Sequence, residues 1–237
     1  MKKEIEDIVS SFIRNCSIAF DVKSGKEFCI MLTRNIEFTP KKRSNGFLSS
    51  PSPELKTVIE DSGLVYGGCG TSRLCLFYKN TLAIKINKAH MLALANKELG
   101  IEDADLLLNG NEDELRNYER LCKEFPFLDV FLLPYYHYFS CGDNFISVFP
   151  KAKTPFKANP FNNEPYLKNK LGLILEIFGD SNMDNVGYYK DVWLIDFNTE
   201  ENGLLISSKI KIIERFLSEF QEEISETRKL VKEIRNE

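Results

Sequence analysis

Residues 179–198 read Gly-Asp-Ser-Asn-Met-Asp-Asn-Val-Gly-Tyr-Tyr-Lys-Asp-Val-Trp-Leu-Ile-Asp-Phe-Asn, and this stretch decides how the chain is interpreted. Asp180 and Asn185 stand five positions apart in an expected loop, and Asp196 follows at the end of an apolar strand. Residues 186–195 are expected to form a small β-hairpin between them. Oxygen ligands suit a hard cation such as Mg²⁺, so Asn185 and Asp196 are candidate metal ligands. Asp180 is a candidate to orient a hydroxyl nucleophile or accept its proton. The alternative is a set of Asx turns that only cap the hairpin.

Two earlier segments contain residues that suit phosphate binding. Residues 66–73, Tyr-Gly-Gly-Cys-Gly-Thr-Ser-Arg, lie between two expected strands. Gly68 and Gly70 carry no Cβ, so their backbone N–H groups can approach phosphate oxygens closely. Lys85 lies inside the apolar run Leu-Ala-Ile-Lys-Ile of residues 82–86, and a buried ammonium needs an anion. The alternatives are a tight hairpin turn for the glycines and a solvent-facing position for the lysine.

The composition is that of a globular protein. The chain has 237 residues and a net charge of −4, with 43% apolar and 28% charged residues, which excludes a disordered or collagen-like chain. The mild acidity argues against a bulk nucleic-acid binder. No apolar run is long enough to cross a bilayer, and no signal-peptide core follows the first lysines, so we expect a cytoplasmic protein without a membrane partner. Six cysteines without a Cys-x-x-Cys pair, beside two histidines, make a zinc site unlikely to form.

Periodicity and turn residues predict the remaining elements. The expected order is a helix over 3–16, a strand over 26–33, a loop over 38–53, a helix over 53–62, a strand over 65–70, a hairpin over 73–78 and 81–86, a helical stretch over 88–123 broken near 108–111, strands over 130–140 and 144–149, a linker over 150–165 and a helix over 166–178.

The last segment has apolar residues at alternating spacings of four and three between Ile206 and Ile234, with Thr227 in the one gap. This heptad pattern predicts a single long helix with an apolar seam. Such a helix either packs on its own domain or binds a partner, as a homo-oligomer or in the groove of another protein.

Together these segments resemble the protein-kinase-like fold, in the compact form of small bacterial and phage kinases and aminoglycoside-type phosphotransferases. The glycine turn resembles the loop that covers the phosphates, and Ala83-Ile84-Lys85 resembles the strand lysine that contacts the α- and β-phosphates. Residues 180–185 are similar to the catalytic loop, whose aspartate and asparagine stand five apart. Residues 195–198, Ile-Asp-Phe-Asn, resemble the metal-binding Asp-Phe-Gly segment. The resemblance extends over residues 64–198.

The resemblance also implies a helix glutamate that pairs with Lys85. Glu114 is our candidate, with Glu119 as the second choice, and residues 145–152 would be the strand and hinge that meet the adenine. The chain departs from the family pattern at Arg73, which replaces the third glycine, and at Asn198, which replaces the glycine after Asp-Phe. No Ala-Pro-Glu segment follows, so an activation loop and the usual peptide groove are both in doubt.

The resemblance implies a two-lobed α+β architecture with a β-rich N-terminal lobe and a reduced helical C-terminal lobe. The expected parts are an extension over 1–62, the N-terminal lobe over 63–152 and the C-terminal lobe over 153–237. The expected function is an ATP- and Mg²⁺-dependent phosphotransferase acting on a protein Ser/Thr hydroxyl. In this reading Asp180 and Lys85 are catalytic, Gly68, Gly70, Lys85 and Glu114 bind the nucleotide, and Asn185 and Asp196 bind the metal. The alternatives are a pseudokinase that assembles through the C-terminal helix and a small-molecule phosphotransferase.

Overall fold

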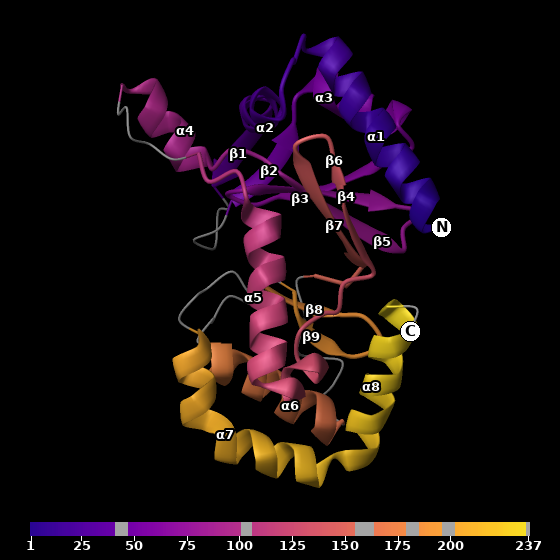
Figure 1. The fold of residues 1–237 in the computed structure, drawn as a ribbon, viewed down its shortest axis with the longest axis vertical. Coiled ribbons are helices and arrows are strands. Elements are labelled where there is room, and N and C mark those ends of the chain that lie inside the picture. Colours follow the sequence, from indigo (N-terminus) through magenta and orange to yellow (C-terminus); the bar gives the residue numbers. More distant parts are fainter. Residues whose placement is uncertain (41–46, 101–105, 155–163, 179–184, 196–201, 236–237) are drawn as a thin grey trace. The chain divides into compact units, whose positions relative to one another are not determined.

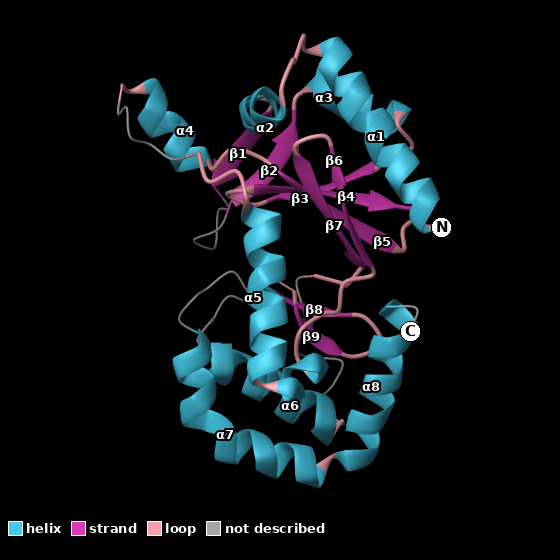
Figure 2. Ribbon diagram, viewed as in Figure 1, coloured by secondary structure: helices cyan, strands magenta, loops and turns pink. Residues whose placement is uncertain are grey.

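The computed structural model describes residues 1–40, 47–100, 106–154, 164–178, 185–195 and 202–235. These residues form a mixed α+β structure with eight α-helices, one five-stranded sheet and two small two-stranded sheets (Figures 1 and 2). The chain divides into two compact units, residues 1–112 with 137–148 and residues 113–136 with 149–237. Each unit is described on its own. No helix among these residues is long and apolar enough to span a bilayer.

The first unit is built on the five-stranded sheet. Its strands are β3 (Val65–Cys69), β4 (Arg73–Tyr78), β5 (Leu82–Asn87), β6 (His137–Cys141) and β7 (Asn144–Pro150), in the spatial order β3-β4-β5-β7-β6. The pairs β3–β4, β4–β5 and β6–β7 are antiparallel. The predicted hairpin turn between β4 and β5 is confirmed, with Lys79 and Asn80 at φ of 48° and 56°. Two successive positive φ angles match the right-handed twist of the strands.

Buried and half-buried side chains alternate along the strands, so the two faces of this sheet differ in burial. On β4 and β5 the residues of one face are buried: Leu74, Leu76, Tyr78, Leu82, Ile84 and Ile86. The intervening residues Cys75, Phe77, Ala83 and Lys85 are only half-buried and lie on the opposite face. The side-chain period of two in a strand therefore places Lys85 on the less covered face.

The N-terminal residues pack against the five-stranded sheet. They form α1 (Lys2–Ala19), α2 (Gly25–Arg34), β1 (Ile36–Pro40), β2 (Phe47–Pro51) and α3 (Pro53–Asp61). Tyr78 Oη donates to Glu4 of α1 at 2.6 Å, and Glu6 of α1 bonds Nε2 of His137 on β6 at 2.8 Å. One helix is thereby attached to both the β4–β5 turn and β6 (Figure 1).

Two sequence-based predictions in this region are wrong. Residues 26–33, expected as a strand, lie in α2 because Ser24 caps the helix and accepts a hydrogen bond from the Glu27 N–H at 3.2 Å. The Glu27 carboxylate accepts from the Lys23 N–H in return, which stabilises the helix start. The segment 38–53, expected as a loop, contributes to the β1–β2 hairpin.

The segment after β5 contains the predicted helical stretch, in two parts. These are α4 (Met91–Glu98) and α5 (Gly110–Glu124). The expected strand over 130–140 is largely wrong, because Pro126 opens the 3-10 turn η1 (Pro126–Val130) and the strand begins only at His137. Pro134 lies in the intervening segment, where a missing N–H does not interrupt a strand ladder.

The second unit packs helices around a small hairpin. Besides most of α5 and the turn η1, its elements are α6 (Pro165–Phe178), β8 (Val186–Tyr188), β9 (Val192–Leu194), α7 (Asn202–Glu219) and α8 (Gln221–Arg235). The hairpin predicted within residues 186–195 is confirmed, and Trp193 lies fully buried in the core.

The C-terminal segment forms two helices instead of the single predicted helix, with a turn at Phe220. Its apolar seam is buried in the core of its own unit, at Ile206, Ile213, Phe220, Ile224, Val231 and Ile234. Phe220 lies 5.1 Å from Phe216 and 5.7 Å from Tyr166, measured between ring centroids. No glycine or proline stands at this bend in the sequence. The aromatic rings pack together where the chain turns.

Candidate functional site

The structure describes five of the seven predicted site residues. They are Gly68, Gly70, Lys85, Glu114 and Asn185, whereas Asp180 and Asp196 lie outside the described residues. Gly68, Gly70 and Lys85 belong to the first unit, and Glu114 and Asn185 belong to the second.

The glycine segment forms a tight β-hairpin with a bulge. Gly68 has a φ of +131°, a conformation that side chains rarely adopt, and the pairing of β3 with β4 shifts register between Tyr66 and Gly68. The Gly70 N–H donates to the Arg73 carbonyl at 2.9 Å, so Thr71 and Ser72 form the tip. Backbone conformation therefore requires glycine at position 68, while Gly70 is exposed and has open space around it.

Two backbone amides of this hairpin already have acceptors. Besides the Gly70 amide, the Cys69 N–H donates to Oγ of Ser49 on β2 at 2.9 Å. A phosphate that bound either amide would replace one of these hydrogen bonds. The hairpin β1–β2 thus contributes directly to the glycine segment, which the sequence did not indicate.

Lys88 anchors the tip of the glycine hairpin and was missed by the sequence analysis. Its side chain is fully buried, and Nζ donates to the Thr71 carbonyl at 2.8 Å and the Ala89 carbonyl at 3.3 Å. Its backbone N–H donates to the Ser72 carbonyl at 2.9 Å. Burial lowers the pKa of Lys88, because the charged amine is removed from water. Its position directly after an apolar strand is the sequence signal for this residue.

Lys85 lies on β5, the third strand of the sheet in chain order and the central strand in space. Its side chain is half-buried, and Cys75 of β4 lies opposite. The Lys85 carbonyl accepts a hydrogen bond from Nδ2 of Asn111, in the first turn of α5, at 2.9 Å. The backbone of the predicted phosphate-binding lysine is therefore tied to the start of the following helix.

The two candidate glutamates on α5 differ in burial. Glu114 is fully buried, whereas Glu119 is exposed. Carboxylates are rarely buried without a compensating partner. The difference favours Glu114 as the glutamate with a structural or functional role.

Asn185 lies at the open end of the β8–β9 hairpin. Val186 pairs with Leu194, and the Asn185 carbonyl accepts a hydrogen bond from the Ile195 N–H at 2.8 Å. The ladder therefore continues to Asn185 and Ile195, and Asp196 is the next residue.

A buried polar cluster holds the closed end of this hairpin. Asp191 Oδ2 accepts hydrogen bonds from Lys170 Nζ at 2.5 Å, Thr227 Oγ1 at 2.6 Å and Tyr166 Oη at 3.1 Å. Burial lowers the pKa of Lys170 to about 8, although the Asp191 carboxylate acts to raise it. Thr227, the polar residue in the heptad seam, is thus explained by its bond to Asp191.

The hairpin is also packed closely by Ala152, the last residue of the segment expected as the strand and hinge, and by the following Lys153. The backbones of Lys153 and Tyr188 exchange two hydrogen bonds, at 2.9 and 3.2 Å. A Cβ placed on Gly187 would lie 2.7 Å from Cβ of Ala152. Gly187 is therefore required by packing, and a glycine inside a strand is a sequence signal for such a close approach.

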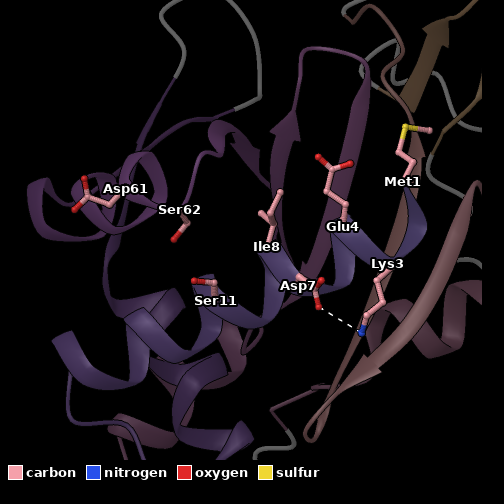
Figure 3. A pocket seen from close by; sticks show the side chains of 8 residues that line it. All are labelled: Met1, Lys3, Glu4, Asp7, Ile8, Ser11, Asp61 and Ser62. Atoms are coloured by element: carbon pink, nitrogen blue, oxygen red, sulfur yellow. Dashed lines mark ion pairs between the residues drawn. The ribbon is translucent and has the colours of Figure 1, made fainter.

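A surface cavity of about 530 Å³ lies elsewhere in the first unit. It is lined by residues of α1 and by Asp61 and Ser62 at the end of α3, and Lys3 forms an exposed ion pair with Asp7 across 3.6 Å (Figure 3). None of the predicted nucleotide-binding residues lines it, and we assign it no ligand.

Within the described part of the chain, no group of three or more His, Cys, Asp or Glu side chains is arranged to hold a metal ion. Comparisons with models of known protein families, with curated protein sequences and with solved structures gave no significant match. The functional interpretation therefore depends on the chain's own residues.

Proposed function

We propose that this protein is an ATP- and Mg²⁺-dependent phosphotransferase of the protein-kinase-like type, with a two-lobed arrangement. The observation that carries the proposal is the order of elements along the chain. A glycine-bearing hairpin leads into Lys85 on the third strand of a five-stranded sheet, and a helix with a buried Glu114 follows. In protein kinases a glycine-rich loop precedes a lysine on the third strand, which pairs with a glutamate of the next helix.

The proposed reaction breaks the bond between the γ-phosphorus and the bridging oxygen of ATP and forms a bond to the acceptor hydroxyl oxygen, leaving ADP. Asp180 accepts the hydroxyl proton, and Lys85 binds the phosphates. Asn185 and Asp196 would supply oxygen donors, which suit a magnesium ion. That ion would neutralise charge on the phosphates, so the protein's contribution is positioning and electrostatic stabilisation.

We propose a protein Ser/Thr hydroxyl as the acceptor, because the helical part of the second unit is small for building a pocket around a small molecule. The small-molecule phosphotransferase remains the alternative within the same chemistry. Assembly through the C-terminal heptads is less favoured, since the seam is buried in the core of its own unit.

Nucleotide binding is tested by thermal unfolding with and without Mg²⁺ and ATP. A ligand at 100 times its dissociation constant stabilises the native state by about 2.7 kcal/mol, which raises Tm by several degrees. We expect this rise in the wild type and its loss in Lys85→Met. Lys79→Met, in the turn of the same β4–β5 hairpin, is the matched control and should keep the rise.

Equal Tm values with and without nucleotide in the wild type would contradict the proposal. A rise in Tm together with no transfer of phosphate to any Ser/Thr substrate would favour the pseudokinase.

A further inference from the structure

Arg73 lies on the same face of the five-stranded sheet as Lys85. It opens β4 directly after the glycine hairpin and pairs with Asn87 of β5. Cys75, two residues further along β4, pairs with Lys85. Residues that oppose each other in an antiparallel pair share a face, and so do residues two apart on one strand. Arg73 and Lys85 are therefore diagonal neighbours, a separation of about 7–8 Å that long side chains can span.

The backbone of Arg73 also closes the glycine hairpin. Its carbonyl accepts hydrogen bonds from the Gly70 N–H at 2.9 Å and from Sγ of Cys69 at 3.3 Å. A phosphate held by this hairpin on the face of Lys85 would therefore lie beside two cationic side chains.

The start of α5 packs on the stem of the Arg73 side chain. A Cβ built on Gly110 would lie 3.6 and 3.7 Å from Cγ and Cδ of Arg73, and the neighbouring Asn111 N–H donates to Oδ1 of Asn87 at 2.8 Å. Arg73 is 8% exposed, whereas Lys85 is half-buried. All of these residues belong to the first unit. Such packing restricts the arginine before any ligand binds, which lowers the entropic cost of binding.

The guanidinium of Arg73 suits a phosphate group. It is planar and can donate to two oxygens of one phosphate at once. A carboxylate also reaches this end of the face, because Nδ2 of Asn87 donates to Oε2 of Glu112 at 2.7 Å. The five N–H donors of an arginine allow it to bind a carboxylate and a phosphate together. Little solvent reaches Arg73, so its attraction to an anion is screened less than in water.

Resting on the proposed function, we propose that Arg73 binds the phosphate chain of the nucleotide together with Lys85. The residue that replaces the third glycine of the family pattern then supplies a second cation to the same face of the sheet. Its role is binding, and it takes no part in bond making or breaking. The site selects its ligand by the phosphates, so ATP binds much more tightly than adenosine.

Calorimetry with ATP and with adenosine, in the presence of Mg²⁺, tests this role in the full chain. Arg73→Met should weaken ATP binding by about tenfold to a hundredfold, as for the loss of a hydrogen bond to a charged group. Adenosine, which has no phosphate, should bind to R73M and to the wild type equally. Arg73→Lys keeps the charge but loses the paired donors, so its loss of ATP affinity should be smaller than that of R73M.

Arg34→Met is the matched control. Arg34 is an exposed arginine of the same unit, and its guanidinium pairs with Glu98 at 3.0 Å. R34M should bind both ligands as the wild type does. If R73M fails to fold, the wild type itself supplies a second measurement. The Nε–H resonance of Arg73 in heteronuclear NMR should shift on addition of ATP and stay in place with adenosine.

Equal weakening of ATP and adenosine binding in R73M would mean that Arg73 only supports the structure, and would overturn the inference. ATP binding by R73M as tight as by the wild type would overturn it too, as would an Nε–H resonance that does not respond to ATP. In each of these cases, loss of ATP binding in Lys85→Met would leave the proposed function standing. If the wild type binds no ATP, the proposed function fails and the inference fails with it.

Discussion

The two hairpins that carry the proposed site residues are each held by a fully buried lysine, but in different ways. Lys88 anchors the glycine hairpin of the first unit through backbone carbonyls, whereas Lys170 anchors the β8–β9 hairpin of the second unit through the Asp191 carboxylate. Burial lowers the pKa of both lysines. The comparison indicates that the second hairpin depends on a charge pair and the first on neutral dipoles, so their sensitivity to substitution should differ.

Removal of Asp191 is expected to have the largest effect on stability. Asp191→Ala leaves the Lys170 ammonium buried without its counter-ion, which typically costs about 3–5 kcal/mol in free energy of unfolding. Lys170→Met should cost less, because Asp191 keeps its bonds from Thr227, Tyr166 and the Val192 N–H. Urea unfolding of the two variants measures the difference.

The exposed pair of Lys209 and Glu176, 2.6 Å apart, provides the control. Lys209→Ala should change the free energy of unfolding by at most about 1 kcal/mol, since solvent screens such pairs. Equal losses in D191A and K209A would show that the buried pair does not hold the second hairpin.

The next effect concerns a glycine in each hairpin. Gly187→Ala places a Cβ against Cβ of Ala152, which has no freedom to rotate away, and overpacking of this kind costs about 1–3 kcal/mol. Gly67→Ala meets the outer atoms of the Phe77 ring at 2.8 Å, which can move, and should cost less. Gly172→Ala, within α6 and without neighbours within 4 Å, should stabilise by about 0.5–1 kcal/mol. A lower Tm for G67A than for G187A in thermal unfolding would contradict this order.

Replacement of Lys88 should have a smaller effect on stability. Lys88→Met removes the hydrogen bonds from Nζ to the Thr71 and Ala89 carbonyls. The first carbonyl still accepts from the Met91 N–H at 3.1 Å, and the second from Oγ1 of Thr33 at 2.7 Å. We expect a loss of about 1 kcal/mol in the free energy of unfolding, together with weaker ATP binding by calorimetry because the hairpin tip is released. A loss as large as that of D191A would mean that the two lysines do not differ as proposed.

The last expected effect is on the pH dependence of stability. Between pH 8 and 10.5 the unfolded chain keeps the Lys170 proton while the native state releases it, so this group makes stability rise with pH. K170M should lack that rise, which amounts to at most about 1.4 kcal/mol per pH unit for one proton. The free energies of unfolding of the wild type and K170M at pH 8 and pH 10 test this expectation. If the difference between the two proteins is the same at both pH values, the lowered pKa of Lys170 is contradicted.

Local signals in the sequence were sufficient for the β4–β5 and β8–β9 hairpins. The Lys79-Asn80 turn and the alternation around it predicted β4 and β5, and the short apolar runs flanking residues 189–191 predicted β8 and β9. These elements are specified by adjacent residues, since turn residues fix the register of a hairpin.

Of the elements that were predicted wrongly, one failed because a local capping signal was overlooked and another because distant residues decide the conformation. Residues 26–33 are apolar enough for either a strand or a helix, and the capping pair Ser24 and Glu27 is what favours the helix. The bend at Phe220 follows aromatic packing against Tyr166, which the heptad spacing does not contain.

The buried polar residues of the candidate site are the clearest case. Asn87 and Asn111 stand 24 positions apart, and Lys170 and Asp191 stand 21 apart. Each is an ordinary polar residue in the sequence, and only the tertiary fold brings their donors and acceptors together. The sequence thus predicted the residues proposed for chemistry but not those that hold them in place.

Phosphate transfer from γ-labelled ATP in the presence of Mg²⁺ tests the central claim most directly. The wild type should transfer label to a Ser/Thr hydroxyl, on itself or on a general protein acceptor, and both Lys85→Met and Asp196→Asn should abolish the transfer. Lys79→Met should transfer as the wild type does. Absence of transfer by the wild type, or undiminished transfer by Lys85→Met and Asp196→Asn, would contradict the proposed phosphotransferase.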